Sequence, residues 1–324
     1  MINPEIYKKL NTLIDYTVNK TLEETNGLKE IKILENNVLF VNIILMKKNE
    51  KLKEKVKSDL VRMVKLDLGF SGIKFQFDYY QLDKKFIFIS SGKGGVGKST
   101  VAALLALYMK DKGFDIGLVD ADIYGPSLSL ILNINDAEMK GNKDEQIYPY
   151  NYDGIEYISV DLFTKEDPLM LRGPMLGKML EMFFNDVLWS NKLEYIIVDM
   201  PPGTGDVALD LNDLCPNNKT LLVTTPNVDA SKVAIKAGLG AMKINQEILG
   251  IVENMSYYLN PVNKERLYIF GTEGSKLVSQ KLNKPILARL PIIPNQNIEI
   301  LKNNDIIKNE FDNIINEILK EEEV

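Results

Sequence analysis

The stretch from Ser90 to Thr100, SSGKGGVGKST, contains the phosphate-binding pattern G-x-x-x-x-G-K-[ST]. Its glycines let backbone N–H groups turn inward around an anion, and a helix that starts where the loop ends adds its positive end. We therefore expect Lys98 to reach the β and γ phosphates of a nucleotide, and the Ser99 hydroxyl to ligate Mg²⁺. The loop residues expected at the nucleotide are Gly92, Lys93, Gly94, Gly95, Val96, Gly97, Lys98, Ser99 and Thr100.

Carboxylates follow two later apolar runs. LVDADIYGP carries Asp120 and Asp122, and YIIVDMPPGTGD carries Asp199. A nucleotide site of this kind needs acids at the ends of neighbouring strands, and Asp199 has the usual form of the acid that supports Mg²⁺, here through water. A lone aspartate in either place indicates only a helix cap or a turn. With the phosphate loop present, we predict a role for Asp122 at the nucleotide site.

The elements that must position these residues lie within 86–324. Apolar runs alternate there with helical stretches, and apolar strands between helices favour a parallel sheet that is covered on both faces. We predict an α/β fold: a P-loop NTPase domain with a mostly parallel sheet and helices on both of its faces. The predicted strands are FIFIS, DIGLVD, EYIIVDM, KTLLVTT, EILGIVEN and PILARL.

Residues 1–80 predict a separate small α/β domain with the order α-β-β-α-β, joined by a linker at 81–85. The first helix is predicted from apolar residues at helical spacing, Ile6, Leu10, Leu13, Ile14 and Val18. IKILENNVLFVNIILM predicts a hairpin that turns at Glu35-Asn36-Asn37, and KLKEKVKSDLVRMVKLDLG predicts a helix that ends at Gly69. GIKFQFDYY predicts the third strand.

Composition excludes several classes of protein. The chain has 324 residues, a net charge of −6, one cysteine and no histidine. An intrachain disulfide is impossible, and the acidic balance makes nucleic acid an unlikely main partner. No apolar run approaches a membrane span, and the first residues lack the apolar core of a signal peptide. We therefore expect a cytoplasmic protein with no membrane partner.

The early lysine of GKGGVGKST gives the loop a resemblance to the deviant Walker A loop of the MinD, ParA and nitrogenase iron protein class. Together with DADIYGPS, LRGPM, IIVDMPPGTGD, VTTP and GIVENMSY, it resembles the Mrp/ApbC family, ATPases that are regarded as iron–sulfur cluster carriers. The resemblance spans residues 86–300, and the 1–80 unit resembles the small domain often fused in front of Mrp proteins. It implies ATP hydrolysis, Mg²⁺, a homodimer, and iron–sulfur assembly or client proteins as partners.

The resemblance also implies roles for single residues. In that class two subunits dock around two ATP molecules, and the early lysine crosses to the partner's nucleotide. Lys93 is then expected to stabilise charge on the transferring phosphoryl group, as an arginine finger does; the alternative is a solvated loop lysine. Asp122, 24 residues after Lys98 (122 − 98), matches the acid that orients the attacking water. Asn254 matches the purine-reading asparagine; the alternative is a turn cap.

The sequence departs from the family where a bridging cluster would bind. Mrp/ApbC proteins carry Cys-x-x-Cys after VENMSY, and two subunits together supply four thiolates. Here Asn260 and Asn263 occupy those positions, and amides do not replace thiolates on iron–sulfur clusters. Cys215, in LNDLCPNNK, lies far along the chain and is interpreted as a packing residue. The sequence therefore predicts no iron–sulfur ligands of the usual kind and makes a resident cluster doubtful.

Three other functions remain as alternatives. A positioning ATPase or switch of the MinD/ParA type would use the same loop without cluster chemistry. A MinD-like lipid tail is disfavoured, because the final helix pairs an apolar face with a mostly acidic polar face. A ParA-like DNA binder is disfavoured by the net charge, and a small-molecule kinase or ligase lacks a recognisable substrate motif.

Overall fold

The computed structural model describes residues 3–47, 49–80, 82, 84–135, 137, 139–142, 146–164, 173–203, 205–216, 218–294 and 297–320. It divides into two compact units, Met1–Leu82 and Asp83–Val324, and each is described by itself. Among the described residues, no helix is both long and apolar enough to cross a membrane.

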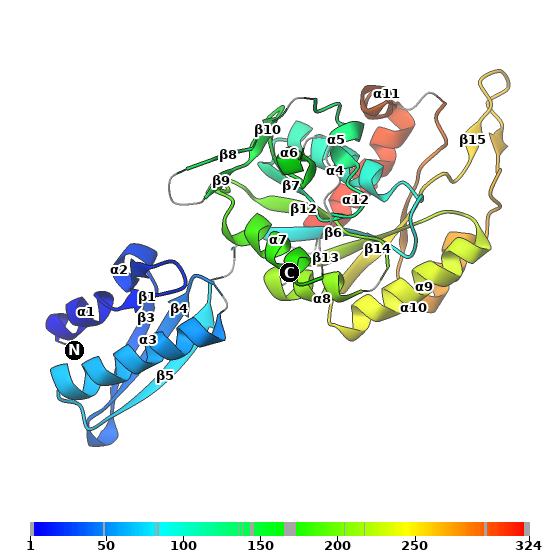
Figure 1. Cartoon of the computed structure of the whole chain (residues 1–324). Helices are drawn as coiled ribbons and strands as arrows, with labels where there is room; N and C mark the ends of the chain where they lie inside the picture. Colours follow the sequence, from blue (N-terminus) through cyan, green and yellow to red (C-terminus); the bar gives the residue numbers. More distant parts are fainter. Residues whose placement is uncertain are drawn as a thin grey trace. The chain divides into compact units, whose positions relative to one another are not determined.

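The first unit is a three-stranded sheet with two main helices (Figure 1). Strands β3 and β4 form an antiparallel hairpin, and β5 pairs with β4 in parallel. Alternate residues of β4 are fully buried, as expected for a strand with one face on a core. The elements, in chain order, are α1 (Pro4–Asn11), β3 (Leu28–Leu34), β4 (Val38–Leu45), α3 (Glu50–Arg62) and β5 (Gly72–Tyr79).

The predicted first helix was too long. It was expected to reach Val18, but α1 ends at Asn11, and two short strands, β1 (Ile14–Asp15) and β2 (Lys20–Thr21), and a short helix, α2 (Leu22–Thr25), follow. The buried Asp15 explains this, because its carboxylate accepts hydrogen bonds from the backbone N–H groups of Thr17 and Met46. Such side-chain to backbone bonds compete with helix formation.

The second unit is an eight-stranded sheet in the order β10-β11-β7-β12-β6-β13-β14-β17. Every neighbouring pair is parallel except β10 and β11, which confirms the predicted mostly parallel α/β fold. The strands are β6 (Lys85–Ser91), β7 (Ile116–Asp120), β10 (Tyr150–Tyr152), β11 (Ile155–Ile158), β12 (Tyr195–Asp199), β13 (Lys219–Thr224), β14 (Glu247–Glu253) and β17 (Ile286–Arg289). β6 thus begins inside the segment predicted as a linker.

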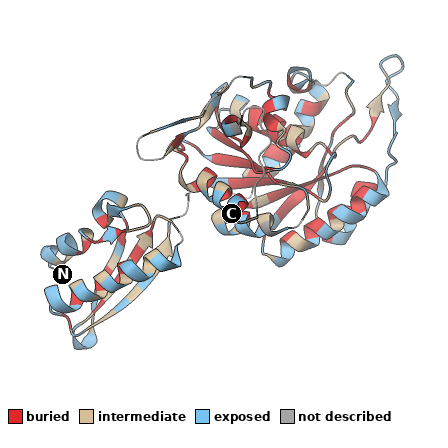
Figure 2. Ribbon diagram, viewed as in Figure 1, coloured by how far each residue is buried: buried red, intermediate tan, exposed pale blue. Residues whose placement is uncertain are grey.

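Helices cover both faces of this sheet (Figure 1). One core cluster joins the sheet to α4, α11 and α12, and another joins it to α9 and α10. All residues of β7 and β12 are buried, as Figure 2 shows in red for the central strands. The helices are α4 (Lys98–Asp111), α5 (Leu128–Ile131), α6 (Asp161–Thr164), α7 (Gly173–Asn185), α8 (Asp206–Leu214), α9 (Val228–Lys243), α10 (Gly274–Leu282), α11 (Ile298–Lys302) and α12 (Asp305–Lys320).

Several short strands were not predicted. β10 and β11 extend the sheet at one edge, and two small pairs, β8 (Lys140–Gly141) with β9 (Ile147–Tyr148) and β15 (Tyr258–Leu259) with β16 (Arg266–Leu267), lie outside it. β15 and β16 form an arm that projects from the unit in Figure 1. None of these strands exceeds four residues, so none carries an apolar run long enough to be detected.

Candidate nucleotide site

The phosphate loop connects β6, a central strand, to the start of α4 (Figure 1). Gly95 and Gly97 adopt φ angles of 77° and 80°, in the left-handed region that favours glycine. The loop borders a hollow of about 310 Å³. The described residues that line it are Ser91, Lys93, Gly94, Gly95, Gly97, Lys98, Ser99, Thr100, Asp122, Gly125, Ser127, Ile131 and Pro202.

Lys98 lies at the base of this hollow with only 6% of its side chain exposed. Its Nζ is 2.5 Å from Oδ1 of Asp199 and 3.7 Å from Oδ2 of Asp122. The three residues come from different elements, and β6, β7 and β12 bring them together because parallel strands end at one edge of the sheet. The structure thus joins three of the predicted site residues.

Asp199 is fully buried, and one of its oxygens has no hydrogen-bond partner in the part of the chain that the structure describes. Burial raises its pKa, while the Lys98 charge and then the Ser99 hydroxyl oppose that rise. Among the described residues, none hydrogen-bonds Oδ2 of Asp199. A buried carboxylate oxygen without a donor is costly, and an ion or an ion-bound water would satisfy it. The donor set of one hydroxyl and one carboxylate therefore fits the predicted Mg²⁺ site.

Asp122 lies on the loop that follows β7 and is 16% exposed at its side chain. Burial raises its pKa, and the charge of Lys98 opposes this effect. Its backbone carbonyl accepts a 3.0 Å hydrogen bond from the N–H of Gly125, which tightens the turn. The carboxylate lines the hollow together with Lys98.

Lys93 extends from the middle of the loop and is exposed. The Ser91 hydroxyl donates a 3.1 Å hydrogen bond to the backbone carbonyl of Lys93, so its backbone is held while its ammonium is accessible. Lys93 and Lys98 thus differ sharply in environment, one accessible and one buried, as the two predicted roles require.

Asn254 follows β14 and contacts the loop directly. Its Nδ2 donates a 2.9 Å hydrogen bond to the carbonyl of Val96, and its Oδ1 accepts one from the N–H of Met255. A Cβ atom on Gly97 would lie 2.2 Å from this Nδ2. Asn254 therefore braces the loop in this structure, a contact that the sequence did not predict, and its reading of a purine stays a prediction.

Asn260 and Asn263 close the tip of the β15–β16 arm. Oδ1 of Asn260 accepts a 2.9 Å hydrogen bond from the N–H of Val262, and Oδ1 of Asn263 accepts a 3.1 Å bond from the N–H of Glu265. Nδ2 of Asn263 also donates to the Glu265 carboxylate at 2.8 Å. The side-chain amides of both asparagines thus stabilise the turn at the tip of the arm.

No cluster of three or more His, Cys, Asp and Glu side chains suited to a metal ion occurs among the described residues. Mg²⁺ needs fewer protein ligands, because it keeps several waters and takes phosphate oxygens.

Cys215 is fully buried at the end of α8, and burial raises the pKa of its thiol well above the usual range. The packing interpretation of Cys215 agrees with this position. Arg172 and Thr204, within LRGPM and PPGTG, lie outside the described residues.

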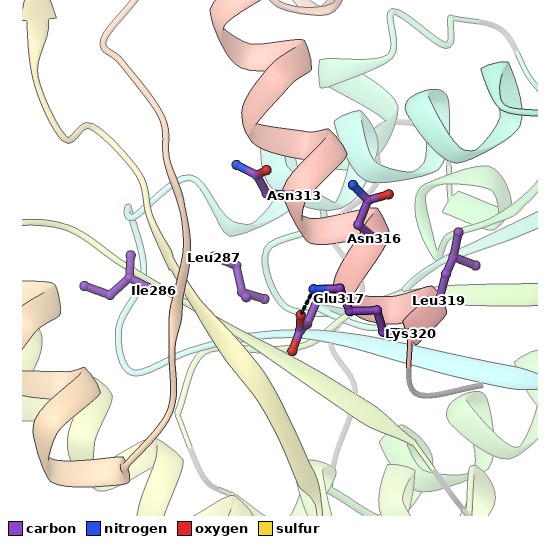
Figure 3. A pocket seen from close by; sticks show the side chains of 7 residues that line it. All are labelled: Ile286, Leu287, Asn313, Asn316, Glu317, Leu319 and Lys320. Atoms are coloured by element: carbon purple, nitrogen blue, oxygen red, sulfur yellow. Dashed lines mark hydrogen bonds and ion pairs between the residues drawn. The ribbon is translucent and has the colours of Figure 1, made fainter. Parts of the chain in front are cut away.

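A second hollow, of about 560 Å³, lies between edge strand β17 and α12 (Figure 3). Its two charged lining residues, Glu317 and Lys320, pair with each other at 3.3 Å. Leu287 lies over Gly250, where a Cβ would be 2.5 Å from its Cγ. These contacts indicate packing between helix and sheet, and we assign this hollow no chemistry.

The loop should tolerate a methyl group at one glycine and not at another. A Cβ on Gly92 would lie 2.5 Å from the backbone nitrogen of Ala234 in α9, whereas a Cβ on Gly94 would meet nothing within 4 Å. We expect Gly92→Ala to destabilise the nucleotide-free protein by about 1–3 kcal/mol, because α9 must shift. Gly94→Ala, the matched control, should stay within about 0.5 kcal/mol. Denaturant unfolding measures both, and equal stabilities would contradict this packing.

A glycine-rich loop between a buried parallel strand and a helix, with an acid from the neighbouring strand against its lysine, defines a P-loop NTPase. Residues 83–321 match the family described as ParA: NUBPL iron-transfer P-loop NTPase, and the chain belongs to this family. The resemblance stated from the sequence motifs is thereby confirmed.

Relatives and solved structures agree with this assignment. The iron-sulfur cluster carrier protein of Bacillus subtilis is 35% identical over 310 residues, 89% of this chain and 87% of the relative. That of Mycobacterium leprae is 38% identical over 64% of this chain, a match that spans 55% of its own length. A nucleotide-binding protein from Archaeoglobus fulgidus in complex with ADP is 30% identical, with a TM-score of 0.56 over 69% of this chain and 87% of that one. The MinD ATPase of Pyrococcus furiosus, 24% identical with a TM-score of 0.52 over 73% of this chain and 98% of its own, shares the fold.

Proposed function

We propose that this protein binds and hydrolyses ATP with Mg²⁺ as a homodimer and acts in iron–sulfur cluster assembly or transfer. The observation that carries the ATPase function is the buried Lys98–Asp199 pair at the phosphate loop, where no described residue hydrogen-bonds Oδ2 of Asp199. The carrier function is drawn from the family and from the names of the relatives. Asn260 and Asn263 stand where the family carries cysteines. We infer that the chain works without those cysteines, either with a cysteine-bearing partner or on another client.

Each residue of the site has a separate role in the proposed hydrolysis. Backbone N–H groups of the loop hold the phosphates, and Lys98 leaves Asp199 to reach the β and γ phosphates. Ser99 and, through water, Asp199 would hold Mg²⁺, which supplies positive charge for the phosphate oxygens. Asp122 orients the attacking water, and Lys93 of the partner subunit stabilises charge on the transferring group. Asn254 reads the purine once a nucleotide is bound.

A direct test is ATP turnover by the purified full-length protein with Mg²⁺ and with excess chelator. Turnover that needs Mg²⁺ supports the proposal, and the absence of turnover in every oligomeric state of the protein would contradict it. Iron and sulfide assays after anaerobic purification, with and without cysteine-bearing candidate partners, test the carrier function separately. A switch of the MinD/ParA type would hydrolyse ATP and transfer no cluster.

Lys98→Met should weaken ATP binding by about 10–100-fold, the effect of losing one charge-assisted hydrogen bond to the phosphates. It should also destabilise the nucleotide-free protein, because Asp199 then loses its buried partner. The double variant Lys98→Met/Asp199→Asn should recover stability but not ATP affinity. Calorimetric titration and thermal unfolding separate the two effects. Unchanged ATP affinity in Lys98→Met would place the phosphates elsewhere.

A further inference from the structure

Asp120 is a buried carboxylate to which the proposed mechanism gives no role. It ends β7, is fully buried, and neighbours Asp199 in the register of the parallel sheet. It does not line the hollow at the phosphate loop. A buried charge is costly unless several hydrogen bonds stabilise it, so its presence here requires an explanation.

Three backbone N–H groups surround the Asp120 carboxylate. Oδ1 accepts a 3.1 Å hydrogen bond from Asp122, and Oδ2 accepts bonds of 3.1 Å from Ser127 and 3.2 Å from Leu128. The donors stand at the start and the end of the loop that joins β7 to α5. Both ends of the loop therefore bond to one side chain, while Tyr124 in the middle of the loop is 66% exposed.

The three hydrogen bonds that the described residues make to this carboxyl group all come from donors, as an ionised carboxylate requires. Burial and then the Asp199 charge raise the pKa of Asp120, and the hydrogen bonds from the N–H groups of Leu128 and Ser127 oppose that rise. An asparagine would place its NH₂ group against at least one of these donors. The three donors therefore favour aspartate over asparagine at position 120. The neighbouring sequence alone does not reveal this preference.

We propose that Asp120 is a positioning residue that holds the loop 121–127 in the shape that places Asp122 beside Lys98. The same loop is tied to the neighbouring strand, because the N–H of Ala121 donates to the carbonyl of Asp199 at 2.9 Å. With both ends fixed, the Asp122 carboxylate is held 3.7 Å from Lys98 before any nucleotide binds. The consequence for turnover rests on the proposed ATPase function, whereas the order of the loop does not.

The test compares Asp120→Asn with Asp115→Asn, the same change at the exposed opposite end of this strand segment. In the nucleotide-free full chain, amide hydrogen exchange of peptides that cover 121–128 should become about tenfold faster in Asp120→Asn and stay unchanged in Asp115→Asn. ATP turnover should fall about 10–100-fold in Asp120→Asn, while the Kd for ATP changes less than about threefold. Asp120→Glu, which keeps the acceptors, should lose less turnover than Asp120→Asn.

The exchange measurement decides the proposal even if the wild-type protein hydrolyses no ATP, which would overturn the proposed function alone. Exchange of 121–128 in Asp120→Asn that equals the wild type would overturn the positioning role. So would a loss of ATP affinity as large as the loss of turnover, because that indicates general damage to the site. If Asp120→Asn does not fold, Asp120→Glu is compared with the wild type, and full turnover together with accelerated exchange of 121–128 would refute the proposal.

Discussion

Lys93→Ala should lower ATP turnover by about 10³-fold or more and change the affinity for ATP by less than about threefold. The lysine is exposed on the loop, whereas Lys98 is buried against Asp199, so removing Lys93 leaves the phosphate cradle intact. A cation that stabilises the transferring phosphoryl group from a partner contributes about 10³–10⁵ in rate. Single-turnover hydrolysis and equilibrium binding of ATP measure the two quantities.

Mixing two inactive variants tests whether Lys93 acts across the dimer. Asp122→Ala removes the water-orienting acid in its own site, and Lys93→Ala removes the lysine offered to the partner's site. In an equal mixture half of the dimers are mixed and one of their two sites is complete, so about one quarter of wild-type turnover should return. No recovery would place Lys93 and Asp122 in the same site.

A surface lysine on the helix that packs against the loop controls for charge alone. Lys232 lies on α9, the helix that packs against Gly92, and its side chain is 69% exposed beside Asp229. Lys232→Ala should keep wild-type turnover. A rate in Lys93→Ala equal to that of Lys232→Ala would show that Lys93 is a solvated loop residue.

The central sheet could be predicted because its strands are buried on both faces. YIIVD and IGLVD are apolar along nearly their whole length, so no alternation was needed to detect them. The apolar face of α12 was equally clear, and Ile307, Phe311, Ile314, Ile315 and Ile318 are all buried. β11 escaped detection because its four residues include Glu156, and α1 was overestimated because Asp15 bonds to backbone beyond the helix.

The sequence predicts which residues belong to the site. It does not predict the contacts between residues that are far apart in the chain. The loop from Gly92 to Thr100 follows from spacing, and Asp122 and Asp199 follow from their places after apolar runs. The resemblance pointed to Asn254. The pairing of Lys98 with Asp199 joins residues 101 positions apart, and the bond from Asn254 to Val96 joins residues 158 apart. Among the described residues, the hydrogen bonds to Asp120 come from backbone N–H groups, which every residue type except proline has, so the sequence does not reveal them.

The arm formed by β15 and β16 makes the predicted lack of a bridging cluster testable by gain of function. Asn260 and Asn263 close its tip with hydrogen bonds to the N–H groups of Val262 and Glu265. Replacing both amides should lower the stability of the arm by about 0.5–1.5 kcal/mol for each hydrogen bond that is lost.

Asn260→Cys/Asn263→Cys should gain a cluster of about four irons per dimer after anaerobic reconstitution, while the parent protein stays colourless. Two arms then supply four thiolates, whereas in the parent the one cysteine of each chain is the buried Cys215. Asn260→Ser/Asn263→Ser is the matched control, because it removes the same amides and adds no thiolate. Iron and acid-labile sulfide are counted against protein. A parent that reconstitutes stoichiometrically, and still does so as Cys215→Ser, would show that the cluster ligands lie elsewhere in the chain.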